Sequence, residues 1–208
     1  MTTAHDLLDL APVIPVVTLN DAEHAVPVAR ALHKGGIGVL ELTLRTPAAL
    51  RAVELVARDV PEIVVGAGTI TTPADARDAA AAGARFLVTP GSTERLLDAA
   101  EATALPVLPG AGSTSEAMRL AERGHTALKF FPAEAGGGLD FLRSLASPLP
   151  GLRFCPTGGI TAERAADYLA LPNVGCVGGS WLTPKHDLAA GDYAAVETLA
   201  REASKLAN

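Results

Sequence analysis

A chain of 208 residues, 49% of them hydrophobic and only 4% aromatic, suffices for one domain with a large aliphatic core. Its formal net charge is −6 and no basic cluster appears, which argues against nucleic acid as a partner. No apolar stretch approaches the roughly 20 residues of a membrane-spanning helix, so we expect no membrane partner either. An anionic substrate is not excluded, because a few local cations and backbone amides decide such binding.

Short runs of valine, isoleucine and leucine recur about every 20 to 25 residues, with alanine-rich helical patterns between them. These runs predict strands at 13–19, 38–43, 63–66, 86–89, 105–109, 127–131, 153–157 and 175–178. The helical patterns predict helices at 4–10, 22–34, 48–59, 73–82, 93–102, 115–123, 139–146, 162–169 and 192–205. Thr72 before Pro73 and Thr161 before Ala162 are typical helix start signals.

Eight predicted strands that alternate with helices indicate an α/β fold with a parallel sheet, and eight strands close a TIM (β/α)8 barrel. The helix at 4–10 would then be an extra N-terminal helix. No linker or change in composition divides the chain, so we expect a single domain over residues 1–208. An open doubly wound sheet is the competing topology, but no G-x-G-x-x-G follows the first strand.

A lysine stands inside an apolar and aromatic run at residues 127–132, Ala-Leu-Lys-Phe-Phe-Pro. In an apolar pocket, the Lys129 amine would lose the hydration that favours its charged form. A neutral amine can attack a carbonyl and form a Schiff base. The alternative is a lysine at a strand end whose ammonium group reaches water.

The second predicted strand carries a polar row. Glu41, Thr43 and Arg45 are two residues apart and share one strand face. By the same spacing, Lys129 and Phe131 share a face of the sixth strand. If both faces point into a barrel, Glu41 and Lys129 meet there as a proton shuttle and a nucleophile. The alternative is an ion pair between Glu41 and Arg45 near the rim.

Glycines follow the last two predicted strands. Gly158 and Gly159 end the seventh, and Gly179 stands beside Ser180 at the end of the eighth. Glycines let the backbone approach a ligand closely, and the loops after strands seven and eight are the usual phosphate site of a barrel. Glycine turns also end the third and fourth strands, at 66–69 and 89–91; turn geometry alone could explain them, so neither by itself identifies a site.

Metal and thiol chemistry are disfavoured. No two of the five histidines have the spacing of metal ligands. Cys155 is expected to be a small buried hydrophobe, since no histidine is placed to activate it. With Cys176 as the second cysteine there is no disulfide framework, and a reducing cytoplasm is the simpler location.

Several segments together resemble one family. HAVPVARAL, VLELTLRT, VGAGTI, TPG, ALKFFPAE, RFCPTGGI and GGSWL occur in the order found in the bacterial 2-keto-3-deoxy-6-phosphogluconate (KDPG) aldolases, which often also act on 4-hydroxy-2-oxoglutarate (KHG). The resemblance covers nearly the whole chain and implies a homotrimeric class I aldolase on a TIM barrel, with a phosphorylated 2-keto acid as substrate and no metal or organic cofactor.

The resemblance also implies roles for single residues. Lys129 matches the Schiff-base lysine and Glu41 the acid/base carboxylate. The other matches are Arg45 and Thr69 near the substrate carboxylate, Pro90 and Phe131 along the pocket, and Gly158, Gly159 and Ser180 at the phosphate.

One segment departs from the family pattern. The family usually has a larger aliphatic residue at Ala111 and threonine at Ser113, which puts substrate preference in question. The alternatives are therefore an aldolase for the galactonate-derived epimer or for an unphosphorylated 2-keto acid. A phosphosugar isomerase or epimerase on the same barrel would need no Schiff base. A non-catalytic phosphate-binding barrel would leave Glu41 and Lys129 unexplained.

Overall fold

Strands and helices alternate along residues 3–206, which the computed structural model describes. The strands are β1 (Val13–Val17), β2 (Val39–Thr43), β3 (Val64–Gly68), β4 (Leu87–Val88), β5 (Val107–Leu108), β6 (Gly110–Ala111), β7 (Ala127–Phe130), β8 (Arg153–Pro156) and β9 (Val177–Gly179). The helices are α1 (Ala4–Asp9), η1 (Ala22–His24, a 3-10 helix), α2 (Ala25–Lys34), α3 (Ala49–Asp59), α4 (Pro73–Ala81), α5 (Glu94–Glu101), α6 (Thr114–Glu122), α7 (Gly138–Leu145), α8 (Ala162–Leu169), α9 (Lys185–Ala190) and α10 (Tyr193–Ala203). The predicted alternation is confirmed.

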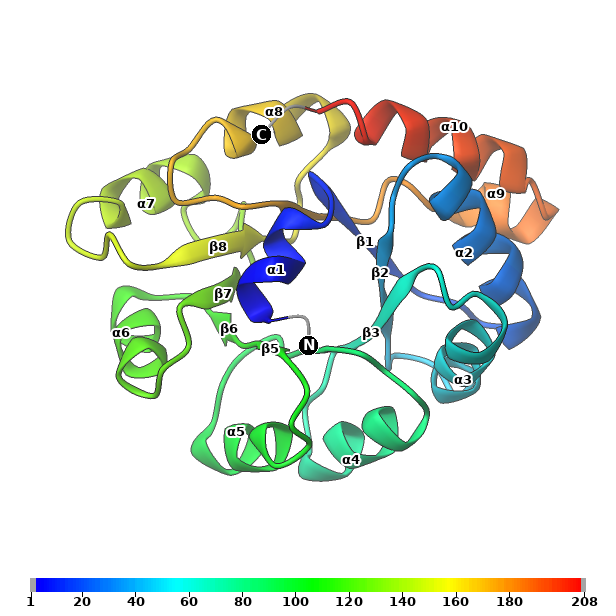
Figure 1. The fold of residues 1–208 in the computed structure, drawn as a ribbon. Coiled ribbons are helices and arrows are strands. Elements are labelled where there is room, and N and C mark those ends of the chain that lie inside the picture. Colours follow the sequence, from blue (N-terminus) through cyan, green and yellow to red (C-terminus); the bar gives the residue numbers. More distant parts are fainter. Residues whose placement is uncertain (1–2, 207–208) are drawn as a thin grey trace.

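All pairings between named strands are parallel within the described residues. They run in the orders β5-β4-β3-β2-β1-β9 and β6-β7-β8. Two single bridges link the region of β8 to that of β9. Phe154, in β8, pairs with Val174, which precedes β9, and Thr157, which follows β8, pairs with Gly178 in β9. The strands gather at the centre with α2 to α8 around them (Figure 1). An α/β fold of parallel strands is therefore confirmed.

The strand expected at 105–109 is observed as β5, and a further short strand, β6, begins directly after Pro109. Proline has no amide hydrogen, and the next amide, of Gly110, donates to Thr89 Oγ1 at 3.0 Å instead of to a strand. Up to this point β5 pairs with β4, whereas β6 pairs with β7. The Pro109 carbonyl already accepts the amide hydrogen of Lys129 at 2.9 Å. The predicted strand is therefore present as the shorter β5, and the segment changes partners at Pro109 to form β6, which was not predicted.

Two helical segments also differ from expectation. The helix predicted at 22–34 is divided into η1, which the Asp21 side chain caps by accepting from the Glu23 amide at 3.0 Å, and α2. Pro27 lies in the first turn of α2, where its missing amide hydrogen costs nothing. Helix α9, six residues long with Pro184 at its N-cap, was not predicted.

The two helix start signals behave differently. Thr72 accepts from the Asp75 amide while the Asp75 side chain accepts from the Thr72 amide, a complete capping box ahead of Pro73. Thr161 also occupies an N-cap position, at α8, but its side chain makes no capping hydrogen bond. Both helices begin where the sequence predicts, although only α4 has the predicted cap.

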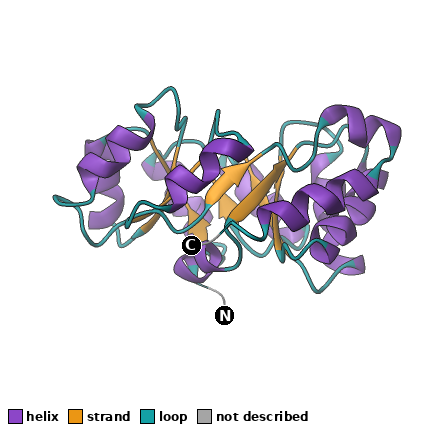
Figure 2. Cartoon of the chain, turned by 90° about the horizontal axis from the view of Figure 1, so that it is seen from above, coloured by secondary structure: helices purple, strands orange, loops and turns teal. Residues whose placement is uncertain are grey.

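Helix α1 lies against the amino-terminal ends of the strands. His5 Nε2 lies 2.7 Å from Thr126 Oγ1, just before β7, and Arg153 at the start of β8 donates to Asp9 at 2.7 and 3.2 Å. In the view from above, the N mark and the helix beside it lie on one side of the strands (Figure 2). The loops at the carboxyl ends of the strands are therefore left uncovered by α1.

The interior is mainly aliphatic, so its buried charges stand out. Glu41 and Lys129 are 2% and 3% exposed.

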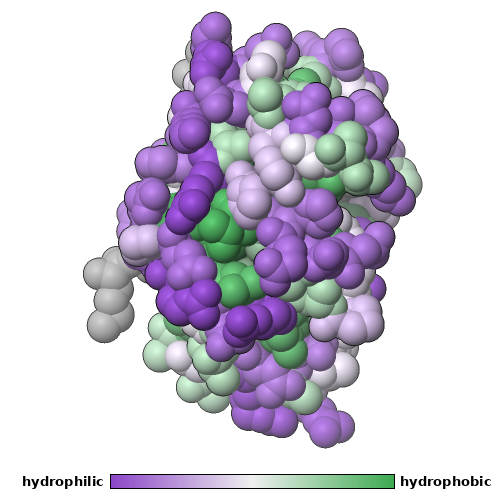
Figure 3. Space-filling model, turned by 90° about the vertical axis from the view of Figure 1, so that its right-hand side faces the viewer, coloured by the Kyte–Doolittle hydropathy of each residue, from purple (hydrophilic) through white to green (hydrophobic). Residues whose placement is uncertain are grey.

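On the face seen in Figure 3 the surface is mostly hydrophilic, with hydrophobic side chains gathered near the middle. Within residues 3–206, no helix has the length and apolar content needed to cross a membrane.

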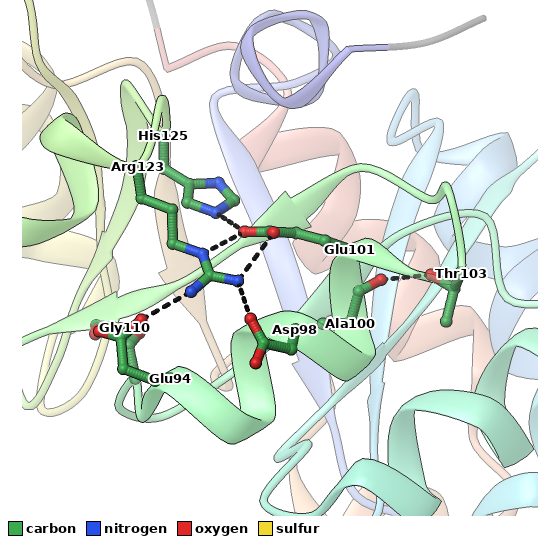
Figure 4. Close-up of polar contacts among 9 residues, drawn as sticks. Glu94, Asp98, Ala100, Glu101, Thr103, Gly110, Arg123 and His125 are labelled. Carbon is green, nitrogen blue, oxygen red and sulfur yellow. Dashed lines mark hydrogen bonds and ion pairs between the residues drawn. The ribbon is translucent and has the colours of Figure 1, made fainter.

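An ion-pair network ties α6 to α5 on the outside of the fold (Figure 4). Arg123, which follows α6, donates to Glu94 at 2.6 Å, to Asp98 at 2.5 Å and to Glu101 at 2.7 and 2.9 Å. His125 Nε2 lies 2.8 Å from Glu101 Oε1. The hydrogen bonds from Arg123 hold the pKa of Glu101 below its usual range.

Candidate active site

Lys129 of β7 and Glu41 of β2 meet in the interior of the fold. The amine nitrogen lies 3.2 Å from Glu41 Oε1 and 3.5 Å from Oε2, although β7 and β2 are far apart in the chain. The two side chains are 4% and 3% exposed. A buried charge is tolerated only when it is paired, so each group depends on the other. The alternative of a lysine that reaches water at a strand end was therefore wrong.

Gly68 of β3 makes the space that the Glu41 carboxylate occupies, whereas Gly66 makes room for the Phe86 ring. Gly66 lies opposite Glu41 in the sheet, and a Cβ on Gly66 would lie 2.3 Å from the Phe86 ring. A Cβ on Gly68 would lie 1.9 Å from Glu41 Oε1 and 2.4 Å from Cδ. Any larger residue at Gly68 would thus displace the carboxylate from its place beside Lys129.

Arg45 does not pair with Glu41 in the described structure. Its Nε donates to Thr69 Oγ1 at 2.9 Å, at the rim of the fold. Thr69 has a φ of 58°, a left-handed conformation that is strained for a β-branched residue. The alternative of a Glu41–Arg45 ion pair was therefore wrong, and a strained hydroxyl residue fixes the guanidinium instead.

A cavity of about 160 Å³ opens at the carboxyl ends of the strands. The Phe131 ring links it to the buried pair, because the ring lines the cavity and its centroid lies 5.5 Å from Lys129 Nζ. Larger hollows of about 550 and 320 Å³ lie elsewhere, but neither Lys129 nor Phe131 lines them. The smaller cavity is lined by Val16, Arg45, Phe131, Thr157, Gly158, Gly159, Ile160, Gly178 and Ser180.

Two backbone amides in this cavity are free to hold an anion. Gly158 and Gly159 have φ angles of 105° and 80°, which favour glycine. The carbonyls of Thr157 and Gly158 accept from the amides of Ala133 and Glu134 at 2.8 and 3.1 Å. In a trans peptide the N–H points opposite to the C=O, so the amides of Gly158 and Gly159 point away from those partners. Neither amide donates to a backbone carbonyl among the described residues, and successive free amides suit a phosphate.

Three of the predicted binding residues lie outside the cavity lining. Thr69 does not line the cavity but accepts a hydrogen bond from Arg45, which does. Pro90 is half-buried, and its carbonyl would lie 2.5 Å from a Cβ on Gly110. Gly179 packs against the Trp181 ring, since a Cβ on Gly179 would lie 2.3 Å from it. The neighbouring Gly178, not Gly179, lines the cavity.

The segment that departs from the family pattern keeps its local structure. Ser113 caps α6 by accepting from the Glu116 amide at 3.3 Å, as a threonine would. Glu116 in turn accepts from the Gly112 amide at 2.7 Å. Ala111 is buried in β6 and pairs with Phe130. Ser113 therefore serves as the cap of α6, and Ala111 lies in a buried strand beside β7.

Cysteines and metal ligands add little to this site. Cys155 and Cys176 are both buried and free, and Cys155 pairs in register with Lys129. The neighbouring Cys155 thiol and burial raise the pKa of Cys176, which keeps it a thiol. Across residues 3–206, no group of three or more histidine, cysteine or acidic side chains is placed to hold a metal ion.

Comparison with known proteins decides the family. A family model described as "Aldolase: KDPG and KHG aldolase" matches residues 4–199. The chain belongs to this aldolase family. The expected resemblance is thereby confirmed.

Similar members of the family include three well-matched proteins. The chain is 50% identical to the 2-dehydro-3-deoxy-phosphogluconate aldolase of Dickeya dadantii over 202 residues, 97% of this chain and 95% of that protein. It is 48% identical to the KHG/KDPG aldolase of Escherichia coli K12 with the same coverage. A crystal structure of KDPG aldolase from Legionella pneumophila, with pyruvate captured at low pH as a covalent carbinolamine, superposes with a TM-score of 0.96. That structure shares 43% identity, and the match covers 98% of this chain and 99% of that one.

Sequence reasoning about this aldolase missed part of the cavity. Thr157 and Gly178 were adjacent to predicted residues, and their positions at strand ends were the available signal. Nothing in the sequence indicated that Val16 and Ile160 line the cavity, because an apolar side chain in or beside a strand is normally assigned to the hydrophobic core.

Proposed function

We propose that this chain is a class I aldolase that cleaves KDPG to pyruvate and glyceraldehyde 3-phosphate through a Schiff base on Lys129. It would also cleave KHG to pyruvate and glyoxylate. The observation that supports this most is the buried amine of Lys129, 3.2 Å from Glu41 Oε1 and next to the ring of Phe131 in the cavity wall. Family membership makes the reaction class the expected one.

The mechanism follows from that pair. Lys129 passes a proton to Glu41 and its neutral amine attacks the C2 ketone; Glu41 returns the proton to the carbinolamine hydroxyl, which leaves as water and gives a protonated imine. Glu41, through a water molecule, removes the proton of the C4 hydroxyl while the C3–C4 bond breaks. The electrons of that bond pass into the imine and form an enamine, and the aldehyde leaves. Protonation at C3 and hydrolysis then release pyruvate and restore the lysine. The imine is the electron sink, so no step requires a metal or an organic cofactor.

The remaining residues would orient the substrate. Arg45, fixed by Thr69, pairs with the substrate carboxylate and turns the ketone toward the amine. Phe131 excludes water from the imine, and Pro90 lies at the edge of the site. Gly158 and Gly159 offer two free amides to the phosphate, with Ser180 also lining the cavity and Gly179 preceding it in the chain.

Reductive trapping tests the proposal. Borohydride added with pyruvate should leave a stable secondary amine on Lys129, located by peptide mass spectrometry, and should abolish activity. Lys129→Met keeps the side chain's length without the amine and should give no adduct. An unmodified Lys129 in trapped wild-type protein contradicts Schiff-base catalysis. It would favour a phosphosugar isomerase or epimerase, which uses the phosphate loops alone.

Substrate preference is the next question, because Ala111 departs from the family pattern. An assay that couples pyruvate release to lactate dehydrogenase should be run on KDPG, on its galactonate-derived epimer and on KHG. We expect KDPG to give the highest kcat/KM. A higher kcat/KM for the epimer or for an unphosphorylated 2-keto acid would reassign the substrate and keep the mechanism.

The finer architecture is also a proposal. We infer that both sheets form one (β/α)8 TIM barrel in a single domain, 1–208, with α1 as the extra N-terminal helix. Support comes from the change of partner at Pro109 and from the Thr157–Gly178 bridge, which bring the ends of the two sheets together. Residues 1, 2, 207 and 208 of that domain lie outside the described range. A homotrimer, testable by sedimentation equilibrium, and a cytoplasmic location stay predictions.

A further inference from the structure

The loop between β7 and α7 packs against the glycine loop that follows β8 and is hydrogen-bonded to it. Ala133 and Glu134 donate their amide hydrogens to the carbonyls of Thr157 and Gly158. These two hydrogen bonds set the peptide planes that carry the free amides of Gly158 and Gly159. The orientation of those amides therefore depends on where residues 133 and 134 are held.

The side chain of Glu134 supports the same loop. A Cβ on Gly159 would lie 2.9 Å from Glu134 Cβ and 3.0 Å from its Cγ. The backbone of Gly159 is thus in close contact with the aliphatic part of Glu134. If Glu134 moved, the loop would lose both a hydrogen bond and the surface on which it rests.

Helix α8 fixes the Glu134 carboxylate. Tyr168, which is fully buried, donates its hydroxyl hydrogen to Oε1 at 2.6 Å. Arg164 Nη1 lies 3.5 Å from Oε2. These two residues are four apart and so share one face of α8, the helix that begins just after the glycine loop. A buried hydroxyl requires an acceptor, and the mechanism above gives Glu134 and Tyr168 no other task.

We propose that Glu134, held by Tyr168, is a positioning residue for the substrate phosphate. It touches neither the reacting carbon atoms nor Lys129, and it acts by holding the amides of Gly158 and Gly159 in the geometry that binds a phosphate. The proposal rests on the proposed function, because it assumes that the anion in this loop is the phosphate of KDPG. The Schiff-base half of the reaction should not depend on it.

The test separates phosphate binding from catalysis. Tyr168→Phe removes only the hydroxyl, and Glu134→Ala removes the carboxylate. Each should raise KM for KDPG by about tenfold, comparable to one weakened hydrogen bond to a charged group, with kcat nearly unchanged. Exchange of the pyruvate methyl hydrogens in D₂O, followed by NMR, needs no phosphate and should keep its wild-type rate. Tyr193→Phe, which removes the hydroxyl that contacts His24 elsewhere, is the matched control and should leave both readouts unchanged.

Conservative replacement gives the second readout. Glu134→Gln still offers an oxygen to Tyr168 and should restore KM for KDPG to near the wild-type value. If Glu134→Ala and Tyr168→Phe change the rates with KDPG, KHG and pyruvate in parallel, the residues are merely structural and the proposal is overturned. An unchanged KM overturns it as well. Should Tyr168→Phe fail to fold, Glu134→Ala decides alone, because its side chain is 30% exposed.

Failure of the proposed function would look different. In that case wild-type protein would cleave neither KDPG nor KHG. Titration calorimetry with inorganic phosphate would then test the positioning role by itself. Wild-type protein should bind phosphate more tightly than Glu134→Ala, and equal affinity would overturn the proposal.

Discussion

Replacing Gly68 with alanine tests whether the position of the Glu41 carboxylate limits the reaction. Gly68 has no positive φ, so alanine suits its backbone, but the added Cβ would lie 1.9 Å from Glu41 Oε1. Real Cβ atoms keep at least 3.0 Å from such neighbours. The carboxylate must therefore withdraw by about 1 Å, a displacement that costs roughly 100-fold in rate when it affects a reacting group. We expect kcat to fall about 100-fold, equivalent to about 2.7 kcal/mol in the barrier.

The lactate dehydrogenase-coupled assay measures this effect, with thermal unfolding as the check on folding. Gly38→Ala is the matched control, because nothing lies within 4 Å of a Cβ there, and it should keep kcat within about twofold. Borohydride trapping with pyruvate should still label Lys129 in Gly68→Ala. A folded Gly68→Ala protein with wild-type kcat would refute the reasoning.

Three further predictions concern other parts of the structure. Glu41→Gln, which keeps the size of the side chain, should lower kcat by roughly 100-fold or more, and a near-normal rate would remove Glu41 from proton transfer. Ser180→Asp should raise KM for KDPG by charge repulsion while KM for KHG changes little; equal effects on both would place the phosphate elsewhere. Arg123→Met should lower Tm at pH 7 by about 1 to 3 °C, the size expected of a partly exposed ion-pair network. Because Arg123 holds the pKa of Glu101 low, this contribution is complete near neutral pH and is lost as the pH falls through that lowered value, so the Tm difference should shrink toward pH 3.

Much of the site was predictable because strand periodicity is strict. Side chains alternate between faces, so the sequence predicts that Glu41 and Lys129 meet if the faces that carry them point inward. Their actual separation and burial agree with that reasoning. Thr72 and Pro73 likewise marked the start of α4, where the capping partners are neighbours in the chain, whereas Thr161 marked the start of α8 without capping it.

Features that depend on distant partners were not predictable. The short strand β6 was not predicted, because it depends on Thr89, twenty-one residues before Gly110, accepting the Gly110 amide, and on pairing with β7. Which of Gly178 and Gly179 faces the cavity depends on where the Trp181 ring packs. The steric need for Gly68 appears only when the Glu41 side chain is placed across from it.

Helix α1 and the cavity lie at opposite ends of the strands, and this has a practical use. An affinity tag or a surface linker joined ahead of α1 would hold the protein by its closed end and leave the entrance facing bulk solution. Immobilised catalyst prepared in this way should turn over as fast as the free enzyme, whereas attachment through an amine engineered into the loop after β8 should obstruct entry.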